Sequence, residues 1–538
     1  MKSLNKYILI GALGFTAVAC NDLDTEPLGS TVTSEQKENV VARDPEMLSA
    51  GTNAVPTMLK QFGNILGTSS HMDFGYPAIM LGLDSRTADM PSLVLGYNWF
   101  SEQIEMSDIN TTSRLTRMIW GTMYNQIFSA NNVLSVVDLE SEDPEVMYFA
   151  AQALGFRANA YFVLAQLYQY TYFGHQNDPC VPIITNENSD EVALNGAPRA
   201  TVEEVYALIN KDIDKCIEFL EATKTIAFTA RADKAFFSAS SAHGLRARIN
   251  LVQHKYTEAI ADAEYAITNS KMTPYAANDI KKPGFWNAAD KSWLWAVIVD
   301  ESDRVVTTGI CNWPSMASTF CRGGYTSVGA WRKGNMTLVE GITSSDVRKG
   351  WWLDANGQSP NLVSPYTQAF VSNAIQDPAT PEYVNVKFGI YQDNMTNTQT
   401  PANDIPLMRI EEMYLIKAEA QAMSGDVAGG CTTLVGLVSR YRDPNYAFSN
   451  GSADVVMNEI WRQRRIEFWG EGIAYYDIMR LNKGIDRRGG GFEPANVYNI
   501  PAGDPILLFQ IPQTEVESNK ALGANNPTTV KPTPVADI

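Results

Sequence analysis

The sequence is poor in histidine and cysteine, and it has no long apolar run after its first 19 residues. The four histidines, His71, His175, His243 and His254, are scattered and form neither an HExxH motif nor another metal-ligand spacing. A GxSxG elbow, a GxxxxGKS/T phosphate loop, a CxxC pair and an EF-hand pattern are all missing. These absences exclude the common catalytic motifs, and the sequence specifies neither a metal site nor a cofactor.

Basic residues are outnumbered: the 538-residue chain has 42 Lys and Arg against 60 Asp and Glu, a formal net charge of −18. A surface that follows a phosphate backbone needs a basic stripe, and none is visible, so nucleic acid and anionic membrane surfaces are excluded as partners. Hydrophobic residues, in contrast, make up 45% of the chain and aromatic residues 10%. This is the composition of a globular protein with a large core.

The first twenty residues have the pattern of a bacterial lipoprotein signal. Lys2 and Lys6 precede an uncharged run over 7–19 that is too short to span a bilayer, and the small residues of A-V-A-C lead up to Cys20. This resembles a lipobox, which implies that residues 1–19 are removed and that Cys20 becomes the lipidated first residue. The alternative is an ordinary secretory peptide that happens to contain a cysteine.

Residues 20–45 lack helical periodicity and indicate an extended leader that follows the lipid. Each buried methylene group of an acyl chain contributes roughly 0.8 kcal/mol, so several chains on Cys20 would anchor the protein firmly in a membrane. If Cys20 carries lipid, five other cysteines remain. Cys311 and Cys321 are close in sequence and flank a loop, so they are the first choice for a disulfide; the alternative is two separate buried thiols.

Most of the periodic signals after residue 110 are helical. Residues 120–134 place one stripe on a helix through steps of three and four: Trp120, Tyr124, Ile127, Asn131 and Leu134. Asp143 before Pro144 predicts a helix start, and Thr201 with Glu204 predicts a capping box. Small residues within 242–267 fall where tetratricopeptide repeats place them in paired helices, although the 34-residue period is kept only loosely.

These signals predict a mainly α fold, with tetratricopeptide-like helix pairs in a right-handed scaffold that packs against an irregular, loop-rich half with a few short strands. A single domain is expected over 46–538. We expect its scaffold mainly in 117–270 and 405–484, and its loop-rich half mainly in 66–110 and 271–400. Long irregular segments inside a compact domain usually carry binding sites.

The two loop segments contain the candidate ligand-binding residues. A sugar site needs flat aromatic platforms beside short polar groups, and both segments offer that mixture. The alternative for each tryptophan is a place in the core. The candidates are Asp84, Arg86, Asp89, Tyr97, Asn98 and Trp99 in the first segment, and Trp313, Tyr325, Trp331 and Arg332 in the second.

Several segments resemble the hallmark sequences of the SusD/RagB family. They are LDTEPLGS after Cys20, WGTMYNQIFSANNVL at 120–134, RIEEMYLIKAEAQA at 409–422, IWRQRRIEFWGEGIAYYDIMRLNKG at 460–484 and ILLFQIPQTEVESN at 506–519. Because they run in this order from one end to the other, the resemblance covers essentially the whole chain.

The resemblance implies a surface-exposed outer-membrane lipoprotein that captures nutrient, usually glycan, and acts as a lid on a SusC-like TonB-dependent transporter. Asp22 and Asp24 are similar to the signals that send such lipoproteins to the cell surface. Two positions depart from the family pattern: the segment usually written ERRxEF begins with Gln463, and the following EGxR has Ala474 in place of its arginine. We interpret the remaining charges as helix-to-helix ion pairs: Arg465, Glu467, Glu471, Asp477 and Arg480.

Three hypotheses about function follow. The first is a non-catalytic glycan-binding lipoprotein that delivers oligosaccharide to its transporter. The second keeps the fold and the location but makes the cargo a peptide, as in the RagB branch. The third is a secreted helical glycosidase, for which the sequence supplies no positive motif.

Overall fold

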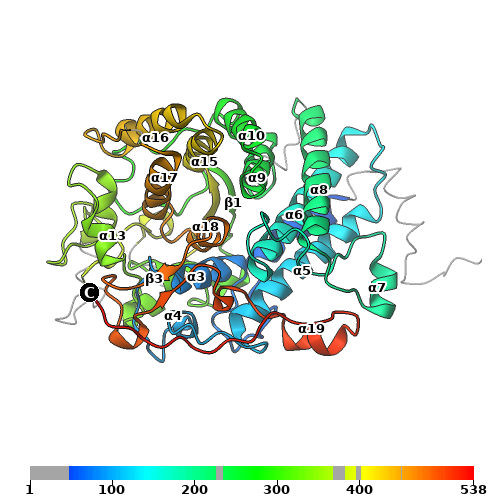
Figure 1. Ribbon diagram of the computed structural model, residues 1–538, viewed down its shortest axis with the longest axis horizontal. Coiled ribbons are helices and arrows are strands. Elements are labelled where there is room, and N and C mark those ends of the chain that lie inside the picture. Colours follow the sequence, from blue (N-terminus) through cyan, green and yellow to red (C-terminus); the bar gives the residue numbers. More distant parts are fainter. Residues whose placement is uncertain (1–47, 226–233, 368–381, 395–400, 450) are drawn as a thin grey trace, which may run out of the picture.

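A computed structural model describes residues 48–225, 234–367, 382–394, 401–449 and 451–538 (Figure 1). The expected signal peptide 1–19, the lipidated Cys20 and the leader 20–45 lie outside the described residues. Among the residues that are described, no helix is both long and apolar enough to cross a membrane.

Long helices pack side by side in a row that crosses the molecule in Figure 1. In this row α5 packs on α6, α6 on α8, α8 on α9, α9 on α10, α10 on α15, and α15 on α16 and α17. These are the expected tetratricopeptide-like pairs, preceded by a short α2 that packs on α5. Their bounds are α2 (Leu48–Thr57), α5 (Arg114–Leu134), α6 (Pro144–Tyr168), α8 (Val202–Thr223), α9 (Ala239–Val252), α10 (Tyr256–Asn269), α15 (Ile410–Met423), α16 (Val427–Tyr441) and α17 (Ala453–Glu467).

The helices start where local chemistry predicts that they start. The side chain of Asp143 accepts hydrogen bonds from the first free N–H groups of α6, with Pro144 at the first helical position. Thr201 and Glu204 form the predicted capping box of α8. A methyl group on Gly155 of α6 would lie 3.0 Å from the Sγ atom of Cys216 on α8, so glycine is what allows these two helices to approach.

The remaining elements are short. Strand β1 (Trp293–Val297) pairs antiparallel with β2 (Ile405–Arg409), and β3 (Ile485–Asp486) pairs antiparallel with β4 (Asn499–Ile500). The short α-helices are α3 (Tyr76–Arg86), α4 (Ser101–Ile104), α7 (Ser189–Asn195), α11 (Arg304–Thr307), α12 (Trp313–Ala317), α13 (Met336–Glu340), α18 (Ala474–Arg480) and α19 (Gln513–Ser518). The 3-10 helices are η2 (Met58–Lys60), η4 (Tyr325–Val328), η5 (Val347–Trp351), η6 (Tyr391–Asp393), η7 (Pro494–Asn496) and η8 (Pro505–Leu507).

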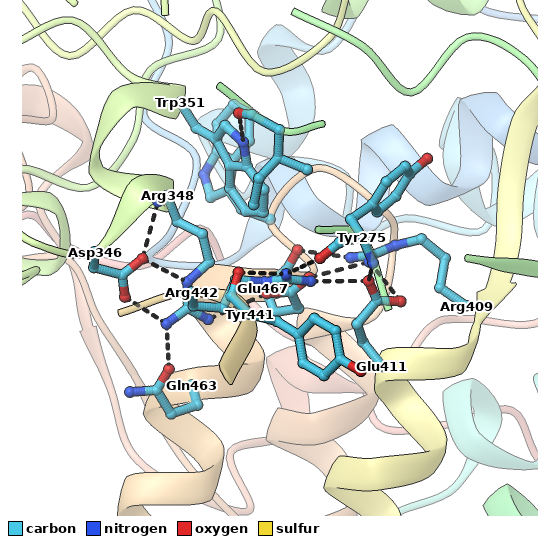
Figure 2. Close-up of polar contacts among 12 residues, drawn as sticks. Tyr275, Asp346, Arg348, Trp351, Arg409, Glu411, Tyr441, Arg442, Gln463 and Glu467 are labelled. Atoms are coloured by element: carbon cyan, nitrogen blue, oxygen red, sulfur yellow. Dashed lines mark hydrogen bonds and ion pairs between the residues drawn. The ribbon is translucent and has the colours of Figure 1, made fainter. Parts of the chain in front are cut away.

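A buried network of charges joins the helical row to the loop-rich half (Figure 2). At its centre Glu467, the last residue of α17, accepts hydrogen bonds from three arginines. Arg442 donates from Nε and Nη2 at 2.8 Å each, Arg409 from Nη1 at 3.0 Å, and Arg348 from Nη1 at 3.2 Å. The three arginines come from the end of α16, from β2 and from η5, so one carboxylate connects four segments.

Two further glutamates complete the charge balance around Arg409. Glu411 lies 2.8 Å from Nη2 of Arg442 and 3.1 Å from Nη1 of Arg409. Glu471 lies 2.8 Å from Nε of Arg409 and 2.7 Å from Nζ of Lys387. Because all of these side chains are buried, each charge is stable only while its partners are in place.

The other charges that the sequence predicted as ion pairs are also paired, some between helices, one within a helix and one with a loop. Arg480 pairs with Glu419 of α15 and, at 2.8 Å, with Asp477. Arg464 reaches Asp477 at 2.7 Å, and Arg465 reaches Asp89 at 2.5 Å. All five predicted charges are paired, but only Arg480 with Glu419 and Asp477 with Arg464 join two helices, so the prediction of helix-to-helix pairs is confirmed in part.

Gln463, the amide that replaces an acid, takes part in the same network. Its Oε1 atom accepts from Nη2 of Arg348 at 2.6 Å, and its Nε2 atom donates to Glu459 at 2.8 Å. Nη2 of Arg348 also lies 2.6 Å from Asp346. An amide can satisfy a donor and an acceptor at once, which a carboxylate in this position could not do.

All five described cysteines are free thiols: Cys180, Cys216, Cys311, Cys321 and Cys431. The expected bridge between Cys311 and Cys321 is therefore absent. The helix α12 lies between them, and Cys321 belongs to a separate apolar cluster with Phe320 and Trp331. Burial raises the pKa of the Cys321 thiol to about 12, so it packs as a small apolar side chain.

We expect thiol titration of a lipid-free fragment beginning at Asn21 to find five free thiols under denaturing, non-reducing conditions. In the native state the same thiols should react slowly, because all five are buried. A value of three under denaturing conditions would show that a disulfide has formed.

Glu467→Gln should destabilise the fold strongly. Burial alone would raise the pKa of Glu467, but Arg442, Arg409 and Arg348 outweigh burial and hold this pKa well below the ordinary 4.5. Removing one partner of a buried ion pair costs about 3 to 5 kcal/mol of unfolding free energy, measurable by chemical denaturation at pH 7.

The matched control is Glu218→Gln, because Glu218 forms an exposed pair with Lys215 and such pairs contribute about 0 to 1 kcal/mol. A depressed pKa in the folded state stabilises the protein above the unfolded pKa and loses that effect as pH falls. The difference between wild type and Glu467→Gln should therefore shrink below pH 4.5. Equal losses for both variants would contradict a central role for Glu467.

Candidate functional site

The two loop segments that the sequence singled out lie against each other. The N–H of Lys333 donates to the carbonyl of Pro91 at 2.9 Å, and the Ser92 hydroxyl donates to the carbonyl of Trp331 at 2.6 Å. Arg332 donates from Nη2 to Oδ1 of Asn98 at 3.1 Å. These contacts bring residues far apart in the sequence to one place.

Three planar side chains cluster where the segments meet. The rings of His71 and Trp99 stack, with centroids 5.0 Å apart and planes 23° apart. Tyr325, the first residue of η4, meets the Trp99 ring edge-on at 6.5 Å and shares a hydrogen bond with Nδ1 of His71. Trp99 and Tyr325 are only partly buried, so part of each ring faces solvent. We call His71, Trp99 and Tyr325 the aromatic cluster.

One further side chain contacts the aromatic cluster, and an exposed tyrosine is near it in sequence. The guanidinium of Arg114, the first residue of α5, lies over the Trp99 ring at 5.5 Å and pairs with Glu102 at 2.8 Å. Tyr97 is 64% exposed and lies two residues before Trp99. The surface thus combines planar rings with a cation and with phenol hydroxyls.

The backbone on both sides of the aromatic cluster is held by side-chain hydrogen bonds. Oδ1 of Asn98 accepts from the N–H of Phe100 at 3.1 Å, and its Nδ2 donates to the carbonyl of Leu93 at 2.7 Å, which fixes the turn that carries Trp99. The N–H of Tyr325 donates to the hydroxyl of Ser315 at 3.1 Å. The cluster is therefore pre-organised, which lowers the entropic cost of binding.

The other two predicted tryptophans lie in the core. Trp313 is 2% exposed and packs edge-on against Phe388, with ring centroids 4.6 Å apart. Trp331 is 8% exposed and belongs to the cluster with Phe320 and Cys321. Neither ring offers a face to a ligand in this structure.

The predicted polar residues are also buried, and each supports a contact between segments. Asp84 accepts from the N–H of Gly472 at 2.9 Å, and burial raises the pKa of its carboxyl to about 8. Arg86 pairs with Asp108. Asp89 pairs with Arg465, as described above.

The two arginines among the candidates, Arg86 and Arg332, have the same structural role. Nη2 of Arg86 donates to the carbonyl of Ile506 at 2.6 Å. Nε of Arg332 donates to the carbonyl of Met316 at 3.0 Å, and burial lowers the pKa of Arg332 to about 9. Of the candidate residues, the structure thus brings Trp99 and Tyr325 together, leaves Tyr97 exposed, and places the rest inside.

Sequence reasoning missed His71 and Arg114. His71 lies in the first loop segment, so a search for planar side chains that included histidine would have found it. Arg114 begins a helix, and no local sequence pattern distinguishes it from the other arginines of the chain.

The arrangement is suited to binding. Planar rings and a guanidinium offer stacking surfaces, and hydroxyl and imidazole groups offer hydrogen bonds. Within the described ranges, no group of three or more His, Cys, Asp or Glu side chains is placed to hold a metal ion. Fold and cluster together define a helical-repeat protein that presents an aromatic surface on loops.

Comparison with known proteins gives the family. Residues 323–528 match the model of the SusD family, and residues 51–251 match a related SusD-like family described as "Starch-binding associating with outer membrane". The chain belongs to the SusD family.

Individual relatives are distant in sequence and similar in fold. SusD-like protein P38 of Formosa agariphila is 23% identical over 394 residues, which are 69% of this chain and 73% of that protein. The structure of a SusD-like carbohydrate binding protein from Bacteroides vulgatus is 21% identical, with a TM-score of 0.71 over 93% of this chain and 99% of that one. A laminarin binding SusD-like protein is 17% identical, with a TM-score of 0.57 over 90% and 99% of the two chains.

Trp313→Ala should destabilise the protein without weakening ligand binding. Removing a buried tryptophan leaves a cavity and costs about 3 to 5 kcal/mol of unfolding free energy. Thermal denaturation would show the lowered melting temperature, and calorimetric titration of the folded variant would show an unchanged affinity. A loss of affinity in a variant of normal stability would instead place Trp313 in the binding site.

Proposed function

We propose that this protein binds glycan at the aromatic cluster of His71, Trp99 and Tyr325 and does not transform it. The observation that carries the proposal is the partly exposed, pre-organised stack of rings where the two loop segments meet. Pyranose rings present C–H groups on their faces and hydroxyls at their edges. The partly exposed rings of Trp99 and Tyr325, with the guanidinium of Arg114 and the hydroxyl of Tyr325, offer partners for both.

The related proteins support the same class of ligand. The description of one matching family includes starch binding. Two proteins with a similar fold are described as a carbohydrate binding protein and a laminarin binding protein. In this proposal the outer-membrane location is inferred from the family, and the contact with the ligand is inferred from the residues of the aromatic cluster.

The proposal extends to capture and delivery at the cell surface. With a lipid on Cys20, the protein would stay at the outer membrane and pass oligosaccharide to a SusC-like TonB-dependent transporter. The length and acidity of residues 20–45 fit a leader that keeps the folded domain clear of the membrane. Residues 46–538 would then act as one binding domain.

Trp99→Ala should weaken glycan binding. Aromatic stacking contributes about 1 to 3 kcal/mol per ring, by analogy with bases on aromatic side chains, so the dissociation constant should rise at least about fivefold. We would titrate the lipid-free protein with laminarihexaose, maltohexaose and xylohexaose, and with basic and neutral decapeptides, by calorimetry.

The matched control is Trp461→Ala. Trp461 is a partly buried tryptophan on α17, with Arg465 and Lys483 over its ring, so its loss should leave glycan affinity unchanged. Binding of the decapeptides with no heat from any saccharide would favour a peptide cargo. If chromatography after the titration shows that the hexasaccharides have been cleaved, the glycosidase hypothesis would be favoured.

A further inference from the structure

A hollow of about 590 Å³ opens beside residues 273–292 and Asp393. Its volume is within the range of small-molecule sites, about 300 to 1,000 Å³. None of its lining residues belongs to the aromatic cluster or borders it. Trp286 lies on its wall, partly exposed, and is the one tryptophan among the residues that line it.

Two adjacent aromatic residues line this wall and differ in burial. Phe285 is 3% exposed and packs edge-on against Tyr275, Trp351 and Phe388, whereas Trp286 is partly exposed. Phe285 has a φ of +59°, a left-handed conformation that bulky residues rarely adopt. Backbone strain of this kind persists only where the surroundings enforce it, and it is common at ligand sites.

Three contacts hold Trp286 in position. Its Nε1–H donates to Oδ1 of Asp393 at 3.2 Å, and its carbonyl accepts from the N–H of Asp404 at 3.0 Å. Tyr391 meets the indole edge-on, with centroids 5.8 Å apart and planes 80° apart. Gln392 and Asp393 both have positive φ, +56° and +53°. Left-handed backbone conformations thus occur at Phe285, which precedes Trp286, and at Asp393, which accepts the hydrogen bond from its indole.

Polar side chains of both signs surround the indole. Asp279 and Lys291 are exposed at the hollow, and Asp290 is partly buried. Oδ2 of Asp290 accepts from the hydroxyl of Tyr275 at 2.5 Å, and Oδ1 of Asn287 accepts from the N–H of Ala289 at 2.8 Å, so both side chains are held in position. Mixed charges and an amide suit a ligand with many hydroxyl groups better than a simple anion or cation.

We propose that this hollow is a second saccharide-binding subsite, in which a pyranose ring lies on Trp286 and its hydroxyls bond to Asn287, Asp290 and Lys291. The inference rests on the proposed function, because it assumes that the protein binds glycan. It adds a second point of contact, at which a long polysaccharide could be held while the aromatic cluster binds another part of the chain. Two weak sites on one domain raise the affinity for a polymer well above that for a short oligosaccharide.

The test measures where saccharide lies and how many molecules bind. Hydroxyl-radical footprinting of the lipid-free protein with laminarihexaose, maltohexaose or xylohexaose would report protection at each tryptophan separately. We expect the hexasaccharide that binds to protect both Trp99 and Trp286, and calorimetry to give two molecules per chain. Trp286→Ala and Trp99→Ala should each reduce this to one molecule, and the double variant should bind none.

The test includes a control variant and a substitute for Trp286→Ala. Trp461→Ala should change neither the protection pattern nor the number of bound molecules. If Trp286→Ala fails to fold, Lys291→Ala removes an exposed side chain of the hollow instead; the loss of its charged hydrogen bond should weaken the second binding event at least about fivefold. Footprinting of the wild type needs no variant.

The outcomes separate this inference from the proposed function. Protection of Trp99 with an unprotected Trp286 and one molecule per chain would overturn the second subsite and leave the proposed function standing. Absence of heat and of protection with all three hexasaccharides would overturn both. Protection of Trp286 that persists in Trp99→Ala would establish the subsite as independent.

Discussion

The fold depends on the carboxylate of Glu467, which three arginines from three other segments share. A carboxylate taken out of water loses several kcal/mol of hydration, and only well-placed partners offset this loss. Here Arg442, Arg409 and Arg348 supply the hydrogen bonds, and Glu411 and Glu471 balance the arginines in turn. Such a network has one low-energy geometry, so it fixes how α15, α16 and α17 meet β2 and η5 (Figure 2).

This constraint allows the loops to be irregular. The aromatic cluster and the Trp286 hollow both lie on segments with little regular structure, which gain few hydrogen bonds from helices or sheets. Their positions are set instead by single contacts, such as Asn98 with Arg332 and Trp286 with Asp393. A rigid scaffold stabilises such loops in conformations, including a left-handed Phe285, that an isolated loop would not keep.

Sequence reasoning found the features that depend on neighbours along the chain. The cap at Asp143, the capping box at Thr201 and the stripe on α5 follow from local chemistry, and the structure confirms them. It could not tell a core tryptophan from a surface one, because Trp313 and Trp99 both lie in irregular sequence rich in polar residues. Trp313 is buried because it packs against Phe388, which is distant in sequence, whereas Trp99 stacks with His71 near the surface. Tertiary packing likewise decides whether Cys311 and Cys321 can form a disulfide, and their closeness in sequence did not show that both are free thiols.

Trp99 and Trp286 are held in position by different kinds of contact. Trp99 is held by stacking, since His71 covers one part of its ring and Arg114 lies over it. Trp286 is held at its edge, since Asp393 accepts from its N–H and Tyr391 meets it at nearly a right angle. A ring held at its edge keeps its face available, whereas a stacked ring must share its face with its neighbour. The two positions therefore suit different parts of one long ligand, and a polymer that contacts both is recognised by shape as well as by composition.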